Sequence, residues 1–104
     1  MPREQIIQEI AKKFEELTLF QHFKGKIVAK IGEALHTETG ETLILYREYN
    51  IVLDMFDEKI WARPMGMFYE NQPYRLEPRF KPLTHNKAAL TIYRYKEQNN
   101  LIPN

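Results

Sequence analysis

The stretch KIVAKIGEALHTETGETLILYREY, Lys26 to Tyr49, has the pattern of two β-strands joined by a short turn. Its first part alternates apolar residues with others until Gly32, and a glycine inside a strand pattern indicates a bulge or a sharp bend. In HTETGE, His36 to Glu41, Gly40 supplies the positive φ that a short hairpin turn needs. The second part is apolar on both faces around Leu43 to Tyr46, which favours a central strand. The stretch therefore predicts an antiparallel hairpin at the centre of the fold.

Further strands are predicted downstream of the hairpin. Residues Ile60 to Arg63 favour a third strand, which ends because Pro64 has no amide hydrogen for a ladder. MGMFYE, residues 65 to 70, then predicts a single helical turn. The proline-rich residues 71 to 83 favour an extended segment in which Arg79-Phe80-Lys81 adds a short edge strand.

Helices are predicted at both ends of the chain. Apolar residues recur at steps of four, four and three from Ile6 to Leu17, which predicts an amphipathic helix over residues 3 to 19 that covers the core. Thr84 is placed to cap a last helix that runs to Asn99. The inward residues of that helix are predicted to be Ala88, Ala89, Ile92 and either Tyr93 or Tyr95.

Composition limits the chemistry. The 104 residues, 43% of them hydrophobic, fit one domain, and no apolar run is long enough to cross a bilayer, so we expect a soluble, cytoplasmic protein. Without cysteine there is no disulfide and no Cys-ligated zinc, and without serine a triad hydrolase is excluded. The four glycines are dispersed, so no phosphate-binding loop is present. Residues 33 to 60 are acidic and residues 61 to 104 basic, which is more typical of solvated faces than of a nucleic-acid site.

Five short motifs occur in order along the middle of the chain: HFKG, GEALHTETGE, LYR, WARPMGMF and Pro78-Arg79-Phe80. Together they resemble the signature of a small bacterial family, domain of unknown function number sixteen fifty-three, over about residues 20 to 81. The resemblance implies a compact, mainly β domain, a small SH3-like barrel, and no established activity. Two departures are visible: the stretch between Arg47 and Trp61 is longer than in the family, and helices are added at both ends.

With this resemblance, the predicted fold class is α+β with a mainly β core. We expect a small SH3-like antiparallel barrel or sheet with an added N-terminal and a C-terminal helix. Residues 1–104 would form a single domain, with a helical extension at 1–20, the β core at 20–82 and a second helical extension at 83–104.

The segment WARPMGMF, Trp61 to Phe68, is the strongest candidate for a recognition surface. Arg63 beside Trp61, with Tyr46 on the neighbouring strand, can form an aromatic-walled groove whose guanidinium binds a carboxylate or phosphate. In the alternative, Trp61, Met65 and Phe68 plug the end of the barrel, and Arg63 pairs with Glu38 or Glu41. Core roles are favoured for both Trp61 and Phe68, because buried aromatic rings dominate small cores.

Histidine chemistry gives a second, weaker candidate. His36 and Glu38 form an H-x-E pair that His22 could complete as a mononuclear metal site, but no ligand spacing identifies one. The favoured alternative is that His36 buttresses the hairpin and Glu38 starts its turn. We therefore predict no metal, no cofactor and no catalytic residue.

Three functions follow in order of preference. The first is a non-catalytic binding module for a peptide or small anionic ligand, with His36, Glu38, Tyr46, Trp61 and Arg63 as its ligand-binding residues. The second is a single-stranded nucleic-acid binder that uses Lys24, Lys26, Arg63, Arg79 and Lys81. The third is a metal-dependent enzyme. No membrane partner is expected.

Overall fold

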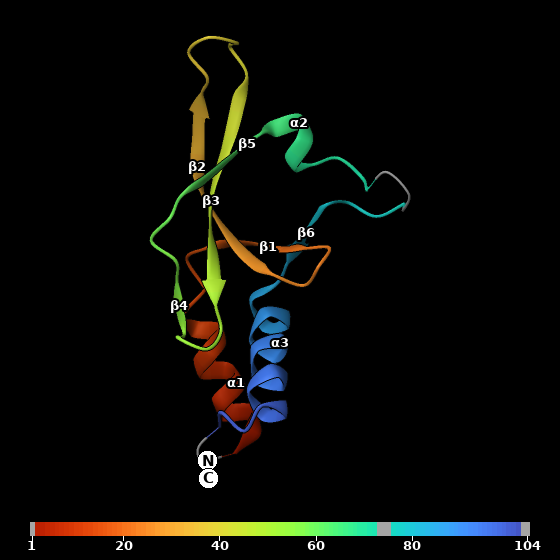
Figure 1. Ribbon diagram of the computed structural model, residues 1–104. Coiled ribbons are helices and arrows are strands. Elements are labelled where there is room, and N and C mark those ends of the chain that lie inside the picture. The colour runs from red at the N-terminus through yellow and green to blue at the C-terminus, as the bar shows by residue number, and fades with distance from the viewer. Residues whose placement is uncertain (1, 73–75, 103–104) are drawn as a thin grey trace.

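The computed structural model describes residues 2–72 and 76–102, and within them it shows a six-stranded antiparallel sheet with a helix at each end of the chain (Figure 1). The predicted α+β class with a mainly β core is confirmed. The elements in chain order are α1 (Arg3–Lys12), β1 (Thr18–His22), β2 (Ile27–Leu35), β3 (Thr42–Asn50), β4 (Met55–Phe56), β5 (Trp61–Pro64), α2 (Met65–Phe68), β6 (Phe80–Leu83) and α3 (His85–Gln98).

The hairpin of β2 and β3 is the centre of the sheet, as predicted. The strand order is β4-β3-β2-β1-β6, with β5 pairing with β3. The β2–β3 pairing shifts between Lys30 and Gly32, which confirms the predicted bulge, and Gly40 has φ +75 in the turn. Strand β6 pairs only with β1 among the described strands, so it is the edge strand that was expected.

The sheet is strongly curled, but it stays open between its two edges. Tyr46 of β3 and Phe80 of β6 are separated in the sheet by β2 and β1, yet their ring centroids are 5.5 Å apart. No pairing joins β5 to β6 in the described part of the chain. Of the two expected forms, barrel or sheet, the structure therefore shows a curled sheet.

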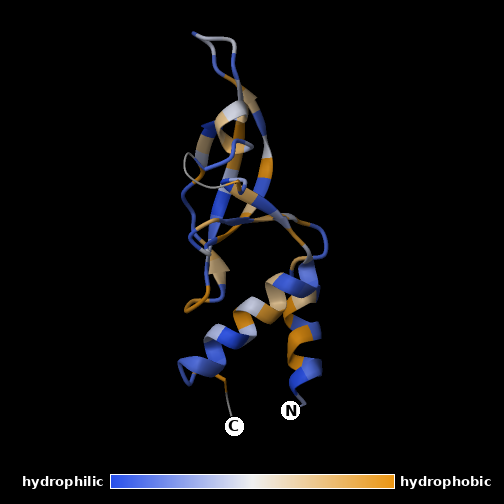
Figure 2. Ribbon diagram, turned by 90° about the vertical axis from the view of Figure 1, so that its right-hand side faces the viewer, coloured by the Kyte–Doolittle hydropathy of each residue, from blue (hydrophilic) through white to orange (hydrophobic). Residues whose placement is uncertain are grey.

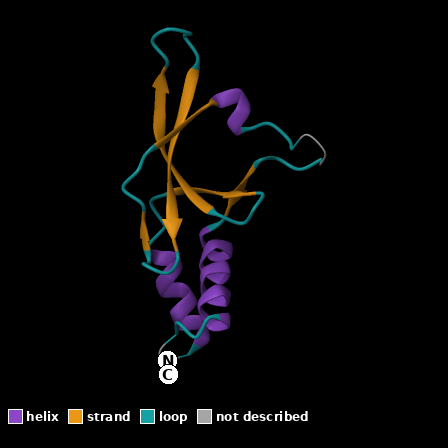
Figure 3. Ribbon diagram, in the orientation of Figure 1, coloured by secondary structure: helices purple, strands orange, loops and turns teal. Residues whose placement is uncertain are grey.

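Helices α1 and α3 lie together at one end of the molecule, where both termini are found (Figures 1 and 3). Figure 2 shows apolar stretches on both helices. Their buried residues join those of one sheet face in a single cluster, which comprises Ile10, Phe14, Leu19, Ile27, Ala29, Tyr49, Ala88, Ala89, Ile92 and Tyr93. The helices therefore cover only that face of the sheet. None of the described helices is long and apolar enough to span a membrane.

Helix α3 confirms its predicted cap and inward face. The Thr84 hydroxyl accepts a hydrogen bond from the Lys87 backbone N–H at 3.1 Å, as expected of an N-cap residue. Of the two tyrosines, Tyr93 is buried at 7% exposure and Tyr95 is 39% exposed. The inward tyrosine is therefore Tyr93.

The predicted helix over residues 3 to 19 is too long. Helix α1 ends at Lys12, and Thr18 begins strand β1. Leu19 and Phe20 are both buried but in different clusters, on opposite faces of the sheet. Only a strand sends consecutive side chains to opposite faces, so burial of both residues overrides the helical pattern.

The second cluster lies on the sheet face opposite the helices. It comprises Phe20, Val28, Ile44, Tyr46, Phe68 and Phe80. The predicted helical turn is present as α2, and its Phe68 stacks on Phe80 with centroids 4.2 Å apart, which confirms a core role for Phe68. The core role favoured for Trp61 is wrong, because this side chain is 41% exposed. Met65 is also exposed, so of Trp61, Met65 and Phe68 only Phe68 belongs to the core.

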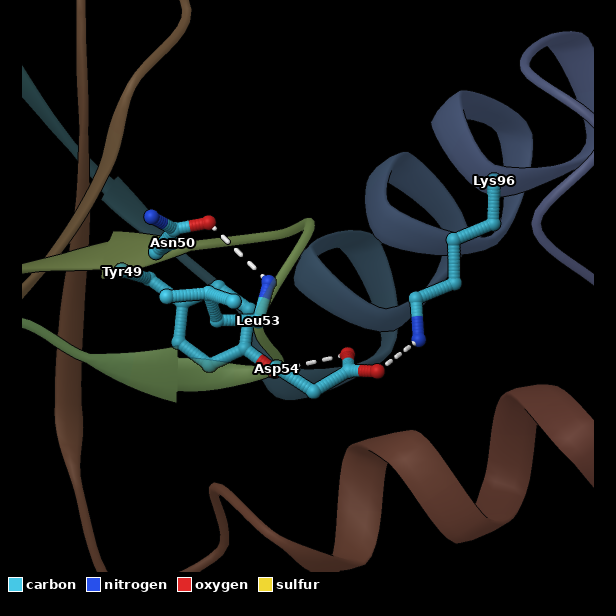
Figure 4. A network of polar contacts seen from close by, with 5 residues as sticks. All are labelled: Tyr49, Asn50, Leu53, Asp54 and Lys96. Carbon is cyan, nitrogen blue, oxygen red and sulfur yellow. Dashed lines mark hydrogen bonds and ion pairs between the residues drawn. The ribbon is translucent and has the colours of Figure 1, made fainter.

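The connection between Arg47 and Trp61 extends the sheet and contacts α3 (Figure 4). Strand β3 continues to Asn50, and Met55–Phe56 returns as β4, a strand that the sequence analysis missed. In the turn between them, Asp54 has φ 54, accepts a hydrogen bond from the Tyr49 hydroxyl at 3.1 Å and forms an ion pair with Lys96 of α3. The connection is thus attached to the C-terminal helix.

Candidate functional site

A pocket with a cavity volume of about 280 Å³ opens on the sheet face opposite the helices. Its walls come from five strands, β1, β2, β3, β5 and β6, and the turn between β1 and β2. The lining residues are His22, Lys24, Lys26, Val28, Tyr46, Glu48, Trp61, Arg63 and Phe80.

Strand alternation explains why these side chains converge. Side chains two residues apart in a strand share a face, which places Tyr46 with Glu48 and Trp61 with Arg63. The antiparallel register puts Tyr46 opposite Trp61 and Ile44 opposite Arg63, so Tyr46 lies beside Trp61, and Glu48 and Arg63 lie in opposite directions from this pair. The curl of the sheet then brings Phe80 of β6 against them from the other edge.

The floor of the pocket is apolar and its rim carries an indole ring. Val28, Tyr46 and Phe80 are exposed by only 0%, 6% and 3%, respectively. Trp61 stands at the rim, and the Lys59 ammonium lies 5.1 Å from the centroid of its ring. An apolar floor with a few polar groups around it is the usual construction of a small-ligand site.

The polar part of the lining is mainly cationic. The Arg63 guanidinium lies 5.8 Å from the centroid of the Phe80 ring. Within residues 2–72 and 76–102, no ion pair joins Arg63 to a carboxylate, so the pairing with Glu38 or Glu41 that was given as the alternative is not found. Lys26 does form an ion pair with Glu48, at 3.4 Å. Arg63 therefore keeps its hydrogen-bonding fork available beside an aromatic floor.

His22 lies in this cationic setting as a neutral ring. Partial burial lowers the pKa of His22 most, and the positive charges of Arg79, Arg63 and Lys24 lower it further, against a smaller opposite effect of Glu48. Its Nδ1 accepts a hydrogen bond from the Lys24 backbone N–H at 3.2 Å. An accepting Nδ1 carries no proton, so the neutral ring has its hydrogen on Nε2.

The structure brings together three of the five residues predicted to bind ligand. Tyr46, Trp61 and Arg63 line the pocket, whereas His36 and Glu38 lie at the hairpin tip outside its lining. There the His36 Nδ1 accepts hydrogen bonds from the backbone N–H groups of Glu38 at 3.2 Å and Thr39 at 3.3 Å. The ring therefore buttresses the turn, which is the alternative favoured from sequence.

The predicted nucleic-acid contacts are divided between two places. Lys24 and Lys26 line the pocket, but Arg79 and Lys81 do not. Arg79 pairs with Glu70 at 3.0 Å, and Lys81 lies 3.6 Å from Glu77. These two cations are therefore already matched by carboxylates.

Besides Val28, Glu48 and Phe80, the sequence analysis left one histidine of the pocket, His22, without a ligand-binding role. It was considered only as a third metal ligand beside His36 and Glu38. In the described part of the chain, no three His, Cys, Asp or Glu side chains come close enough together to hold a metal ion. The motif HFKGK places two lysines within four residues of His22, and this local positive charge was the signal available.

Fold and site together define a small α+β domain whose curled sheet carries helices on one face and a cationic, aromatic-floored pocket on the other. A family model described as "Protein of unknown function (DUF1653)" matches residues 18–82, so the chain belongs to this family. The match ends before α3 and begins after α1, so both helices lie outside it, as the resemblance indicated.

A solved structure of the same family gives a similar fold. It is the crystal structure of a DUF1653 protein from Bordetella bronchiseptica, which is 20% identical and superposes with a TM-score of 0.52. The match covers 70% of this chain and 92% of that chain. At this identity the likeness shows the fold alone. No curated protein matches the chain.

Proposed function

We propose that the protein is a non-catalytic binding module that recognises a peptide or small anionic ligand through the pocket at Trp61 and Arg63. One observation carries the proposal: a guanidinium without a carboxylate partner among the described residues stands over an aromatic floor in an open cavity. A guanidinium in this position can bind a carboxylate or phosphate with two parallel hydrogen bonds.

The charge of the lining supports an anionic ligand. Lys24, Lys26 and Arg63 are positive, and Glu48 is the opposing acid in the lining. Because Lys26 already pairs with Glu48, the charges of Lys24 and Arg63 remain for a ligand. The rings of Tyr46 and Trp61 offer flat apolar surface for the rest of that ligand.

The same contacts give less support to the other two functions. A nucleic-acid groove needs a continuous stripe of available cations, and the carboxylates of Glu70 and Glu77 oppose Arg79 and Lys81. An acid–base enzyme needs a carboxylate or histidine that is placed for proton transfer, but Glu48 of the pocket is held by Lys26, and the His22 Nδ1 already accepts the Lys24 N–H.

Trp61 allows a direct test, because it is the only tryptophan in the sequence and it stands at the pocket rim. We would titrate carboxylates, phosphates and their neutral amides while recording Trp61 fluorescence. Anions should change the emission in a saturable way, and neutral amides should not.

The matched variants are Arg63→Lys and Arg94→Lys, the latter on the exposed side of α3. Arg63→Lys should weaken binding several-fold with almost no change in melting temperature, since a point charge does not reproduce the planar fork. Arg94→Lys should leave binding unchanged. A large loss of stability in Arg63→Lys with binding intact would show that Arg63 is a scaffold residue.

A further inference from the structure

We propose that the pocket takes an aromatic carboxylate and that His22 takes up a proton when the carboxylate binds. This inference rests on the proposed function, because it assigns a chemical class and a pH response to the same pocket. The flat group would lie on the floor between Trp61 and Phe80, and the carboxylate would lie among His22, Lys24 and Arg63.

The ligand class follows from the pairing of aromatic and cationic surfaces. Tyr46, Trp61 and Phe80 supply ring faces and edges, with which another flat ring packs more favourably than an aliphatic chain. The volume of about 280 Å³ is at the lower end for small-ligand sites, so it suits one ring with its acid group. Arg63 supplies the two parallel donors that a carboxylate accepts.

His22 is held neutral in the free protein by its surroundings. Protonation would put a hydrogen on Nδ1 and break the hydrogen bond that Nδ1 accepts from the Lys24 N–H. It would also add a positive charge to a group that is already cationic. The charged groups around the ring are Arg79 next to β6, Arg63 of β5, Lys24 and Lys26 of the turn, Glu48 of β3, and Glu77 and Lys81 around the adjoining cavity.

A bound carboxylate reverses this balance. Its negative charge offsets those of Arg63 and Lys24, and its oxygens can accept hydrogen bonds from the ring and from the released Lys24 N–H. The pKa of His22, which is lowered from its ordinary value in the free protein, therefore rises when the carboxylate binds. The proton comes from solvent, and no covalent step is involved.

The sign of the pH effect follows from linkage. Above the pKa of the complex, His22 is neutral in both states, and affinity is low and constant. As pH falls through that pKa, affinity rises by up to about tenfold per pH unit, and it levels off below the pKa of the free protein. Carboxylic acids titrate near pH 4, so the ligand itself stays charged over this range.

The test uses benzoate and its neutral analogue benzamide with the full chain. Trp61 fluorescence should show benzoate binding that tightens as pH falls from neutral, and no binding of benzamide. NMR titration of the His22 ring should give a higher midpoint with benzoate than with benzamide. The His36 ring in the same spectra serves as an internal reference, because it lies at the hairpin tip.

His22→Asn is the variant that separates charge from structure. The Asn amide oxygen can still accept the Lys24 N–H, but the side chain cannot take up a proton. The variant should bind benzoate with an affinity that no longer changes with pH. If it does not fold, the NMR titration of the unsubstituted protein still decides the question.

The two sources of such a ligand are separated by a second pair of probes, N-acetylphenylalanine and its amide. Tighter binding of N-acetylphenylalanine than of benzoate would support the inference with a peptide carboxyl terminus as ligand, and the reverse order would support it with a small aromatic acid.

Benzoate binding that is independent of pH, with an unmoved His22 midpoint, would overturn the inference and leave the proposed function standing. A change in Trp61 fluorescence with inorganic phosphate, but with neither benzoate nor N-acetylphenylalanine, would also overturn the inference and leave the proposed function standing. Absence of any response to anions would overturn both.

Discussion

The contact between Asp54 and Lys96 should carry a measurable part of the stability of the protein. Asp54 lies in the turn between β3 and β4, and Lys96 lies on α3, so their ion pair links two segments 42 residues apart (Figure 4). The Lys96 side chain is only 16% exposed and that of Asp54 35% exposed, so solvent screens this pair less than an ordinary surface pair.

Asp54→Asn tests the charge alone. Asn tolerates the positive φ of 54 at this position at least as well as Asp does, and it can still accept the Tyr49 hydroxyl. Exposed pairs contribute about 0–1 kcal/mol, and breaking fully buried pairs costs about 3–5 kcal/mol. For this half-buried pair we expect a loss of about 2 kcal/mol, which corresponds to a fall in melting temperature of roughly 10 °C in a domain of this size.

The double mutant with Lys96→Met decides whether the two residues act through each other. Denaturant unfolding of Asp54→Asn, Lys96→Met and the double mutant should give a coupling free energy of about 1 kcal/mol or more. As a control, Lys26 and Glu48 form an ion pair whose Lys side chain is 53% exposed, and Lys26→Met should cost much less than Lys96→Met. Additive losses from Asp54→Asn and Lys96→Met would refute the reasoning.

Two further predictions concern Tyr49 and the two faces of the aromatic segment. Burial, and then the charge of Asp54 and the hydrogen bond to it, raise the pKa of Tyr49, so the contribution of Tyr49 to stability is present below its unfolded pKa of about 10 and is lost as pH rises above that value. Between about pH 9 and pH 11, the free energy of unfolding of Tyr49→Phe should therefore fall less steeply than that of the unsubstituted protein, and equal slopes would contradict this. Phe68→Ala should cost about 3–5 kcal/mol in thermal or denaturant unfolding because Phe68 is fully buried, whereas Trp61→Ala should cost about 1 kcal/mol or less; equal losses would mean that Trp61 is part of the core after all.

Local signals predicted the hairpin well because its determinants are local. The bulge at Gly32, the positive φ of Gly40 and the Thr84 cap each depend on a few neighbouring residues. The extent of α1 does not depend on neighbouring residues alone, because Thr18 to Phe20 become a strand only when β2 and β6 are present to pair with them. Strand β4 depends in the same way on the contact of its turn with α3.

The candidate site was predicted only in part, because some of its residues are brought together by local strand pairing and others by the overall curl of the sheet. Tyr46, Trp61 and Arg63 come together through strand pairing, which the hairpin pattern and the strand at Trp61 already implied. His22 and Phe80 reach the pocket through the curl of the sheet, which no short motif encodes. Conversely, the proximity of His36 and Glu38 in sequence suggested a site, but the His36 ring accepts a hydrogen bond from the Glu38 backbone N–H and so stabilises the hairpin turn itself.

Exposure of Trp61 is the observation that most favours a recognition role over a scaffold role for this face. Burying a side chain of this size would contribute more to folding than burying almost any other, and the adjacent core had room for Phe68 instead. The indole is left at the mouth of a cavity, next to Arg63 and beneath the Lys59 ammonium. Tryptophan and arginine are the residues that most often dominate binding energy at interfaces, because they combine large apolar area with directional donors. Folding alone gives no reason to keep both at the rim of a pocket, whereas binding of a flat anion uses both.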